Sequence, residues 1–462
     1  MAVFLIIFAV EAILCKIMFN PTAETDMEMF SLGLMILNAL IVFVLLTNVV
    51  DRKDKDHRYM TKLFMASFGL RLFLLLWDIY ARHIFVLPNS EADAVWYHTA
   101  SVSYAFLGRS NLVDLNEYSY YVGLLYRLIG SQKLTIEFLH VFLSMWALVL
   151  IYKILCMLNV REKIRRQTIT IVALLPNLMI IGTVFLQESV ISFLLILSLY
   201  FYTKWWTKQG ALYFLLSFLP PIAASFLHTG GIVTAVGFAV TYMLVGNRER
   251  KLKITPGKMI LGVALIGVML VLMSSFSSTL FGKIGGELSA DAIVNNAGQT
   301  DRVSDAEYSV GIKGLPPAVD IVVNSPIRML YFVSSPLPWM WRGLGDIIAF
   351  FGSALFYIWC VYLCFKAFKD AKGKKKPEQL WAFFIVLLIT LIIASLMFGW
   401  GVSNTGSALR HREKFTYLFA VLFGVTQECI AHFGGKTDEE DGDGHRTDLR
   451  GRKLPNGLYY KY

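Results

Sequence analysis

Long apolar runs separated by short charged linkers extend through most of this chain. A run of roughly 17–25 apolar residues is long enough to cross a bilayer as one helix. Runs of about this length lie at 2–19, 31–50, 63–80, 134–157, 168–186, 189–204, 211–227, 230–246, 259–281, 346–365, 381–400 and 415–432. The pattern predicts an all-α, polytopic integral membrane protein with about twelve transmembrane helices, formed by residues 1–432.

Two apolar blocks, 168–203 and 211–246, are each too long for a single crossing. Each block must therefore fold back on itself. Polar residues lie near the two midpoints, Gln187-Glu188-Ser189 in the first block and His228-Thr229-Gly230-Gly231 in the second. We expect both turns to reach the outer surface of the membrane.

Lys and Arg are concentrated in the short linkers 51–62, 158–167, 247–258 and 366–376. Short basic loops stay on the cytoplasmic side of a membrane, so we expect these linkers inside. Alternation of the helices from these anchors then makes 81–133 and 282–345 two large extracytoplasmic loops.

Both termini are expected in the cytoplasm. The N-terminal hairpin 1–50 is predicted to stay anchored, because it lacks the basic region and small-residue cleavage site of a secretory signal. The charged, glycine-rich tail 433–462 is predicted to be disordered. The Asn-x-Thr match Asn20-Pro21-Thr22 contains a proline that prevents glycosylation, which favours a bacterial plasma membrane.

The composition supports a membrane protein and limits the classes of partner that it can bind. Hydrophobic residues make up 56% of the 462 positions and charged residues only 16%, and the mean hydropathy is +0.57. The net charge of +10 is carried by linkers between apolar runs, which excludes nucleic acid as the partner. The chain has no phosphate-binding glycine loop, so no ATP-driven engine is expected.

The loop 81–133 contains the first candidate for chemistry, Asp93. Ser90 followed three residues later by Asp93 is typical of a capping box at the start of a helix. The functional alternative is that Asp93, held above the membrane, removes a proton from an acceptor hydroxyl as a general base. Tyr97 and His98, one turn further on, are candidates for substrate binding. The two interpretations of Asp93 are compatible.

Three segments resemble a known enzyme superfamily: ADAVWYH, then YYVGLLYRLIG from Tyr120, then LLPNLMIIGTVFLQESVISFLL from Leu174. They are similar to bacterial members of the GT-C superfamily of polyprenyl-phosphate-dependent glycosyltransferases, such as protein O-mannosyltransferases and lipid A aminoarabinose transferases. The resemblance extends over about residues 63–230. It implies that an acid in the first large outer loop, here Asp93, is the catalytic base of an inverting transfer.

Two features depart from that superfamily. Many of its members carry Lys-Glu where this chain has Gln187-Glu188, so the expected charge contact with a donor phosphate is missing at Gln187. Many also place the acidic loop after the first span, whereas the hairpin 1–50 is an extra element here. Glu188 itself is retained, and we interpret it as a second catalytic candidate.

Glu188 and His228 each have a structural alternative. A carboxylate at a helix start is stabilised by the helix dipole without any catalytic role, and a histidine beside an apolar helix is often only hydrogen-bonded. The functional alternative is that both orient the acceptor or the donor sugar. A divalent cation held by Asp93, His98, Glu188 and His228 is a further alternative, although no ligand spacing supports a metal site.

A basic cluster before the last apolar run departs from the positive-inside pattern. It contains Arg410, His411 and Arg412, followed by Glu413 and Lys414, at the expected outer end of the last span. Arginine recognises phosphate through a bidentate fork, so this cluster is predicted to bind the phosphate of a lipid-linked donor. The alternative is a belt of side chains that contact lipid headgroups.

Together these patterns predict a membrane glycosyltransferase that moves a sugar from a polyprenyl-phosphate carrier to a cell-surface glycan or lipid acceptor. Two alternatives stay open. A Wzy-like surface polysaccharide polymerase would use lipid-pyrophosphate substrates in the same compartment. A lipid-linked glycan transporter or flippase would need polar residues distributed through its spans, whereas the polar residues here gather at the outer edges.

Overall fold

The computed structural model describes residues 1–22, 25–91, 93–108, 116–245, 250–276, 291, 294, 310–402 and 404–434. The chain is 79% helical, and the described residues contain no strand. In the part of the chain that the structure describes, eight helices are long and apolar enough to cross a membrane: α1 (Ala2–Phe19), α2 (Glu28–Thr47), α3 (His57–Tyr80), α6 (Lys133–Met157), α9 (Glu188–Lys208), the continuous stretch Leu344–Asp370, α19 (Glu378–Gly401) and α21 (Thr416–Phe433). The protein is therefore a helical protein of membrane type, as predicted.

Four of the twelve expected spans form shorter or broken helices. These are α7 (Glu162–Ala173) with α8 (Pro176–Ile181), α10 (Ala211–Leu216) with α11 (Leu219–Leu227), α12 (Val233–Leu244), and α13 (Pro256–Phe276), of which Pro256–Gly267 is the apolar part described. Proline explains the first two breaks, because it lacks an amide donor and is best accommodated in the first turn of a helix. Pro176 begins α8, and Pro220 and Pro221 lie in the first turn of α11. The count of twelve spans stays a prediction.

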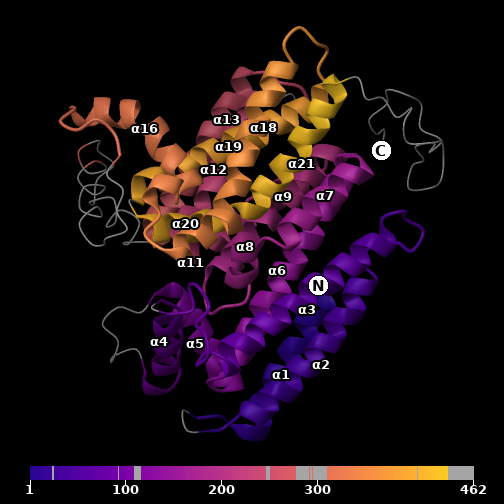
Figure 1. Ribbon diagram of the computed structural model, residues 1–462, viewed down its shortest axis with the longest axis vertical. Helices are drawn as coiled ribbons and strands as arrows, with labels where there is room; N and C mark the ends of the chain where they lie inside the picture. Colours follow the sequence, from indigo (N-terminus) through magenta and orange to yellow (C-terminus); the bar gives the residue numbers. More distant parts are fainter. Residues whose placement is uncertain are drawn as a thin grey trace.

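The first apolar block folds back as expected, but its turn is buried. Both α7 and α9 pack against α6 and α21, so the chain reverses between them (Figure 1). Gln187, Glu188 and Ser189 are all buried, which overturns the expectation that this turn reaches the surface. The neighbouring residues Val184–Leu186 belong to an apolar cluster with Tyr97, Tyr118 and Tyr126.

The segment 81–133 contributes side chains to that cluster. The segment contains two packed helices, α4 (Asp93–Leu107) and α5 (Glu117–Ile129), and their aromatic side chains cover the 184–187 turn. In Figure 1 this helix pair lies at the lower end of the molecule. The second expected loop, 282–345, is described only in part, with α16 (Pro317–Ser334) as its main helix. The tail 433–462 lies outside the described residues beyond Gly434.

An arginine inside the bundle stabilises the break between α7 and α8. Arg71 on α3 is fully buried, and it donates hydrogen bonds to the carbonyl oxygen of Ala173 (3.0 Å) and to the hydroxyl of Ser144 (2.9 Å). Ala173 is the last residue of α7, so Arg71 provides a donor for a carbonyl that the interrupted helix leaves without its own. This contact helps to hold the turn before α9 in place.

The basic linkers meet at the opposite end of the molecule from α4 and α5. Buried Asp56 accepts hydrogen bonds from Arg165 (3.0 Å) and Arg166 (2.8 Å), and Arg161 pairs with Glu428 at 3.0 Å. These ion pairs join the linkers 51–62 and 158–167 to the end of α21, and the loop between α18 (Leu355–Asp370) and α19 lies at this same end (Figure 1). The side of the membrane that each end faces stays a prediction.

This arrangement makes a topological prediction. A single cysteine replacing exposed Ile84 should react with a membrane-impermeant thiol reagent in intact cells, whereas one replacing exposed Lys375 should react only after lysis, because basic linkers resist translocation. Four native cysteines are buried and Cys156 is half-buried, so background labelling should be low. Labelling of the Lys375 variant in intact cells would overturn the assignment of the two faces.

Candidate functional site

A cavity in the described residues lies where α4 meets α20 (Thr405–Glu413). Its volume is about 340 Å³, within the range that binds small organic molecules. Its wall is formed by Val86, Leu87, Pro88, Asn89, Glu91, Asp93 and Arg410. Two predicted site residues, Asp93 and Arg410, therefore line one cavity although they lie far apart in the sequence.

Arg410 joins two of the predicted carboxylates. Its guanidinium pairs with the Asp93 carboxylate, and its Nε lies 2.9 Å from Oε1 of Glu188. The Asp93 side chain is 49% exposed, that of Arg410 is 20% exposed, and that of Glu188 is 0% exposed. The three residues thus run from the cavity into the protein interior.

Each member of this trio sits at the helix end that suits its charge. Asp93 is the first residue of α4 and Glu188 the first of α9, where the helix dipole stabilises negative charge. Arg410 lies in the last turn of α20, where the dipole stabilises positive charge. The side chain of Asn404 begins α20 by accepting the Ser407 amide at 2.7 Å. The positions of these residues at helix ends therefore favour their charged forms and their pairing.

Lys414 belongs to the predicted basic cluster, and the structure places it beside Glu188. Its Nζ lies 3.8 Å from Oε1 of Glu188, and its side chain is almost fully buried. Neither oxygen of Glu188 accepts an aligned hydrogen bond from a described residue, so the carboxylate depends on the two cations beside it. The sequence signal for this contact is the four-residue spacing between Arg410 and Lys414, because residues four apart share a helix face.

Neighbouring charges shift the pKa of two groups in the site. Burial by itself lowers the pKa of Arg410, but the carboxylates of Glu188 and Asp93 outweigh burial and raise it above its ordinary value. Burial, and then the negative charge of Glu188, raises the pKa of Tyr97. The Tyr97 hydroxyl therefore stays neutral, and it accepts a hydrogen bond from Gln187 at 3.3 Å.

Two predicted histidines meet behind the trio. The rings of His228 and His411 lie 5.0 Å apart, and the His228 ring stacks on Phe398 at 5.8 Å. Nδ1 of His411 must accept the 2.6 Å hydrogen bond from the Lys414 ammonium, and Nδ1 of His228 accepts the Gly230 amide at 3.1 Å. When neutral, both rings therefore carry their proton on Nε2.

His98 has a different environment. Its Nδ1 is 2.8 Å from the Tyr126 hydroxyl, and its ring packs edge-on against Phe185 at 5.4 Å. Burial, with a smaller contribution from the Lys133 charge, lowers the pKa of His98 to about 4. His98 therefore joins α4 to α5 as a neutral residue, and its contacts indicate packing within the outer helix pair.

Arg412 and Arg410 have different contacts because they lie on different faces of α20. Residues two positions apart lie on different faces, and the fully buried Arg412 guanidinium donates to the carbonyl oxygens of Val333 (2.7 Å) and Ser335 (2.8 Å). It also lies over the Tyr357 ring at 4.6 Å. Arg412 therefore fixes the C-terminal end of α16, and Arg410 is the arginine that lines the cavity.

Glu413 likewise belongs to the interior. It accepts hydrogen bonds from Asn177 (2.7 Å), Ser353 (2.6 Å) and Thr416 (2.6 Å). The sequence treated residues 410–414 as one basic cluster at the outer end of the last span, but the side chains from Arg412 onward are buried. The hydropathy pattern did not indicate that α20 is enclosed by α9, α16 and α19.

The four-residue metal site considered from the sequence is not assembled. Within the described ranges, no group of three or more His, Cys, Asp or Glu side chains is arranged to hold a metal ion. Arg410 lies between Asp93 and Glu188, and His98 contacts Tyr126 instead. A guanidinium thus occupies the position that a cation bridging those two carboxylates would need.

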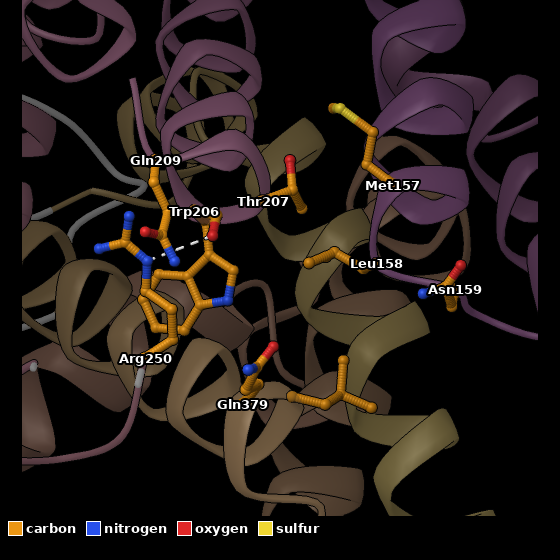
Figure 2. A pocket seen from close by; sticks show the side chains of 9 residues that line it. Met157, Leu158, Asn159, Trp206, Thr207, Gln209, Arg250 and Gln379 are labelled. Carbon is orange, nitrogen blue, oxygen red and sulfur yellow. Dashed lines mark hydrogen bonds between the residues drawn. The ribbon is translucent and has the colours of Figure 1, made fainter. Parts of the chain in front are cut away.

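Another cavity lies at the end with the basic linkers, and Figure 2 shows the residues that line it. Its volume is about 50 Å³, too small for a sugar. Arg250 beside it donates to the carbonyl oxygens of Trp206 (3.2 Å, dashed in Figure 2) and Trp205 (2.8 Å). These carbonyls lie in the last turn of α9, so Arg250 caps that helix. The cavity beside Asp93 is the better candidate for function.

No protein-family model, curated protein or solved structure matches this chain. The resemblance to GT-C enzymes therefore stays a prediction from the sequence motifs. The fold and site define a helical protein of membrane type with a charged cavity at one end of the bundle.

Removal of the Glu188 charge should affect the stability of an Arg410 variant and an Arg412 variant differently. Arg410→Gln leaves Glu188 buried with one cation at 3.8 Å, and we expect a loss of about 3 kcal/mol of stability, because breaking a buried pair leaves an uncompensated charge. Adding Glu188→Gln should restore most of it. Arg412→Gln should also destabilise, but Glu188→Gln should not rescue it.

Thermal unfolding of the purified variants in detergent tests this cycle. Equal rescue of both arginine variants by Glu188→Gln, or of neither, would contradict the assigned pairing.

Proposed function

We propose that this protein is a membrane glycosyltransferase that moves a sugar from a polyprenyl-phosphate carrier to a glycan or lipid acceptor at the outer face. The observation that carries the proposal is the position of Arg410, which pairs with Asp93 at the cavity and with buried Glu188 behind it. A phosphate-binding group and a candidate base thus share one site of suitable volume.

The ion pair implies an order of events. Without substrate, the Asp93 carboxylate is held in its ion pair with Arg410. A donor phosphate competes for the same guanidinium, whose planar fork binds phosphate through two parallel hydrogen bonds. Glu188 retains its contact with Nε, so Arg410 stays in place while it exchanges Asp93 for the donor. Donor binding therefore releases Asp93 for catalysis.

The chemistry then needs one proton transfer and one displacement. Asp93 takes the proton of the acceptor hydroxyl, and the resulting oxygen attacks the anomeric carbon of the sugar. The bond between that carbon and the phosphate oxygen breaks, and polyprenyl phosphate leaves with the bonding electrons. Arg410 stabilises the negative charge that develops on the leaving phosphate, with inversion at the anomeric carbon. The lipid-phosphate sugar supplies the driving force.

The remaining charges support this role. Arg410 and Lys414 compensate the charges of Asp93 and Glu188, and Glu91 adds a third carboxylate to the cavity wall. When the phosphate takes the place of Asp93 on Arg410, the released carboxylate is available to accept the proton of the acceptor hydroxyl.

Replacement of Asp93 by Asn tests the chemical step. Asn keeps the size and capping ability of Asp but is not a base, so transfer should fall by about 10²–10⁴-fold with stability little changed. The matched control is Asp26→Asn at the start of α2, where Asp26 accepts the Glu28 amide at 3.0 Å. Transfer from purified lipid-linked donor to acceptor should persist in the control.

Near-normal transfer by the Asp93→Asn protein would remove Asp93 from the mechanism. That result would favour the polymerase or the transporter over the glycosyltransferase.

A further inference from the structure

The wall of the cavity beside Asp93 comes mostly from an irregular segment. Residues 81–91 connect α3 to α4, and Val86, Leu87, Pro88, Asn89 and Glu91 of this segment line the cavity. Asp93 follows directly at the start of α4. Because the segment has no helix of its own, side-chain contacts must determine the shape of the wall and the position of Asp93.

Two hydrogen bonds attach this segment to the end of α3, and a third, between Arg82 and Ser90, lies within the segment. The Trp77 indole donates to the carbonyl oxygen of Phe85 at 2.9 Å, and Arg82 donates to the carbonyl oxygen of Ser90 at 2.8 Å. The hydroxyl of Ser90 donates to the carboxylate of Asp78. Ser90 is fully buried, three positions before Asp93. Both the backbone and the side chain of Ser90 are therefore held.

Asp78 is in turn attached to α6. Its carboxylate lies 2.6 Å from the Lys133 ammonium, which also lies 3.2 Å from Glu137. Both carboxylate side chains are 0% exposed. Two buried carboxylates therefore share one ammonium, and the Ser90 hydroxyl supplies Asp78 with a second donor. Asp78 links the ends of two long helices to the residue that precedes the α4 start.

We propose that the Asp78–Ser90 contact is a latch that fixes the cavity wall and positions Asp93. The role of the latch in transfer rests on the proposed function, in which Asp93 is the base. Asp78 and Ser90 act through the segment 81–91 and are positioning residues. Arg410 and Glu188 come from α20 and α9, so the latch should affect the base more than the phosphate contact.

The reporter is a cysteine in the wall itself. Leu87→Cys places a thiol in the buried part of the segment, so its rate of reaction with a thiol reagent measures opening of the segment. Ser90→Ala in the full-length protein should raise that rate about tenfold, because a hydrogen bond to a charged acceptor is lost. Ser31→Ala is the matched control, since buried Ser31 bonds Thr135 at 3.1 Å away from this segment.

A kinetic readout separates positioning from general stability. With Leu87 restored, Ser90→Ala should lower kcat about tenfold or more while KM for the lipid-linked donor stays within about twofold. Asp78→Asn is a second variant, tolerable because Lys133 then balances Glu137 alone. It keeps an acceptor for Ser90, so its labelling rate and kcat should lie between those of the wild type and Ser90→Ala.

The two readouts fail separately. An unchanged labelling rate in Ser90→Ala would overturn the latch, whatever the protein's activity proves to be. Faster labelling with unchanged kcat would overturn the positioning role. If Asp93→Asn retains full transfer, the proposed function fails, and the labelling rate still decides whether the latch exists.

Discussion

The pairing of Arg410 with both Asp93 and Glu188 is the interaction on which the rest of the site depends. A carboxylate as deeply buried as Glu188 is costly unless cations compensate it, and it accepts no aligned hydrogen bond from the described residues. Arg410 and Lys414 provide that compensation from one face of the α20 region. In doing so they bring together α4, α9 and α20, which are distant in the sequence.

Arginines also stabilise the irregular helices around this site. Backbone carbonyls at helix ends need donors, and the need is greatest inside a membrane, where water is absent. Arg71 supplies donors at the end of α7, Arg250 at the end of α9 and Arg412 at the end of α16. Each of these arginines is buried and donates to carbonyl oxygens. Arg71 thereby stabilises the break between α7 and α8, Arg412 stabilises the end of α16, and Arg250 caps α9 at its end away from the cavity.

Hydropathy predicted the parts of this structure that depend on length and composition. Eight of the expected spans form long apolar helices, and Asp93, Glu188 and Arg410 converge although they were chosen separately. Pro176 is a local signal that the run 168–186 is divided. The pattern could not show that aromatic residues of α4 and α5 pack on Val184–Leu186, just before the buried 187–189 turn. That feature depends on contacts between distant segments, which a local pattern does not contain.

The basic cluster shows the same limit at the level of single residues. Arg410 and Arg412 have the same chemistry and are two positions apart, yet one lines the cavity and the other caps α16. Helix phase separates them, and the phase was predictable once α20 was recognised as a helix. What α20 packs against was not predictable from the residues alone.

The most direct test of this account is the affinity of the purified protein for a polyprenyl monophosphate without sugar, followed by phosphorus NMR in lipid nanodiscs. Asp93 and the phosphate compete for Arg410, so Asp93→Asn should bind the monophosphate about fivefold more tightly than the wild type, given roughly 1 kcal/mol for a half-exposed ion pair. The Arg410→Gln/Glu188→Gln protein should bind it weakly. Equal or weaker binding by Asp93→Asn, or undiminished binding without Arg410, would contradict the shared-arginine site.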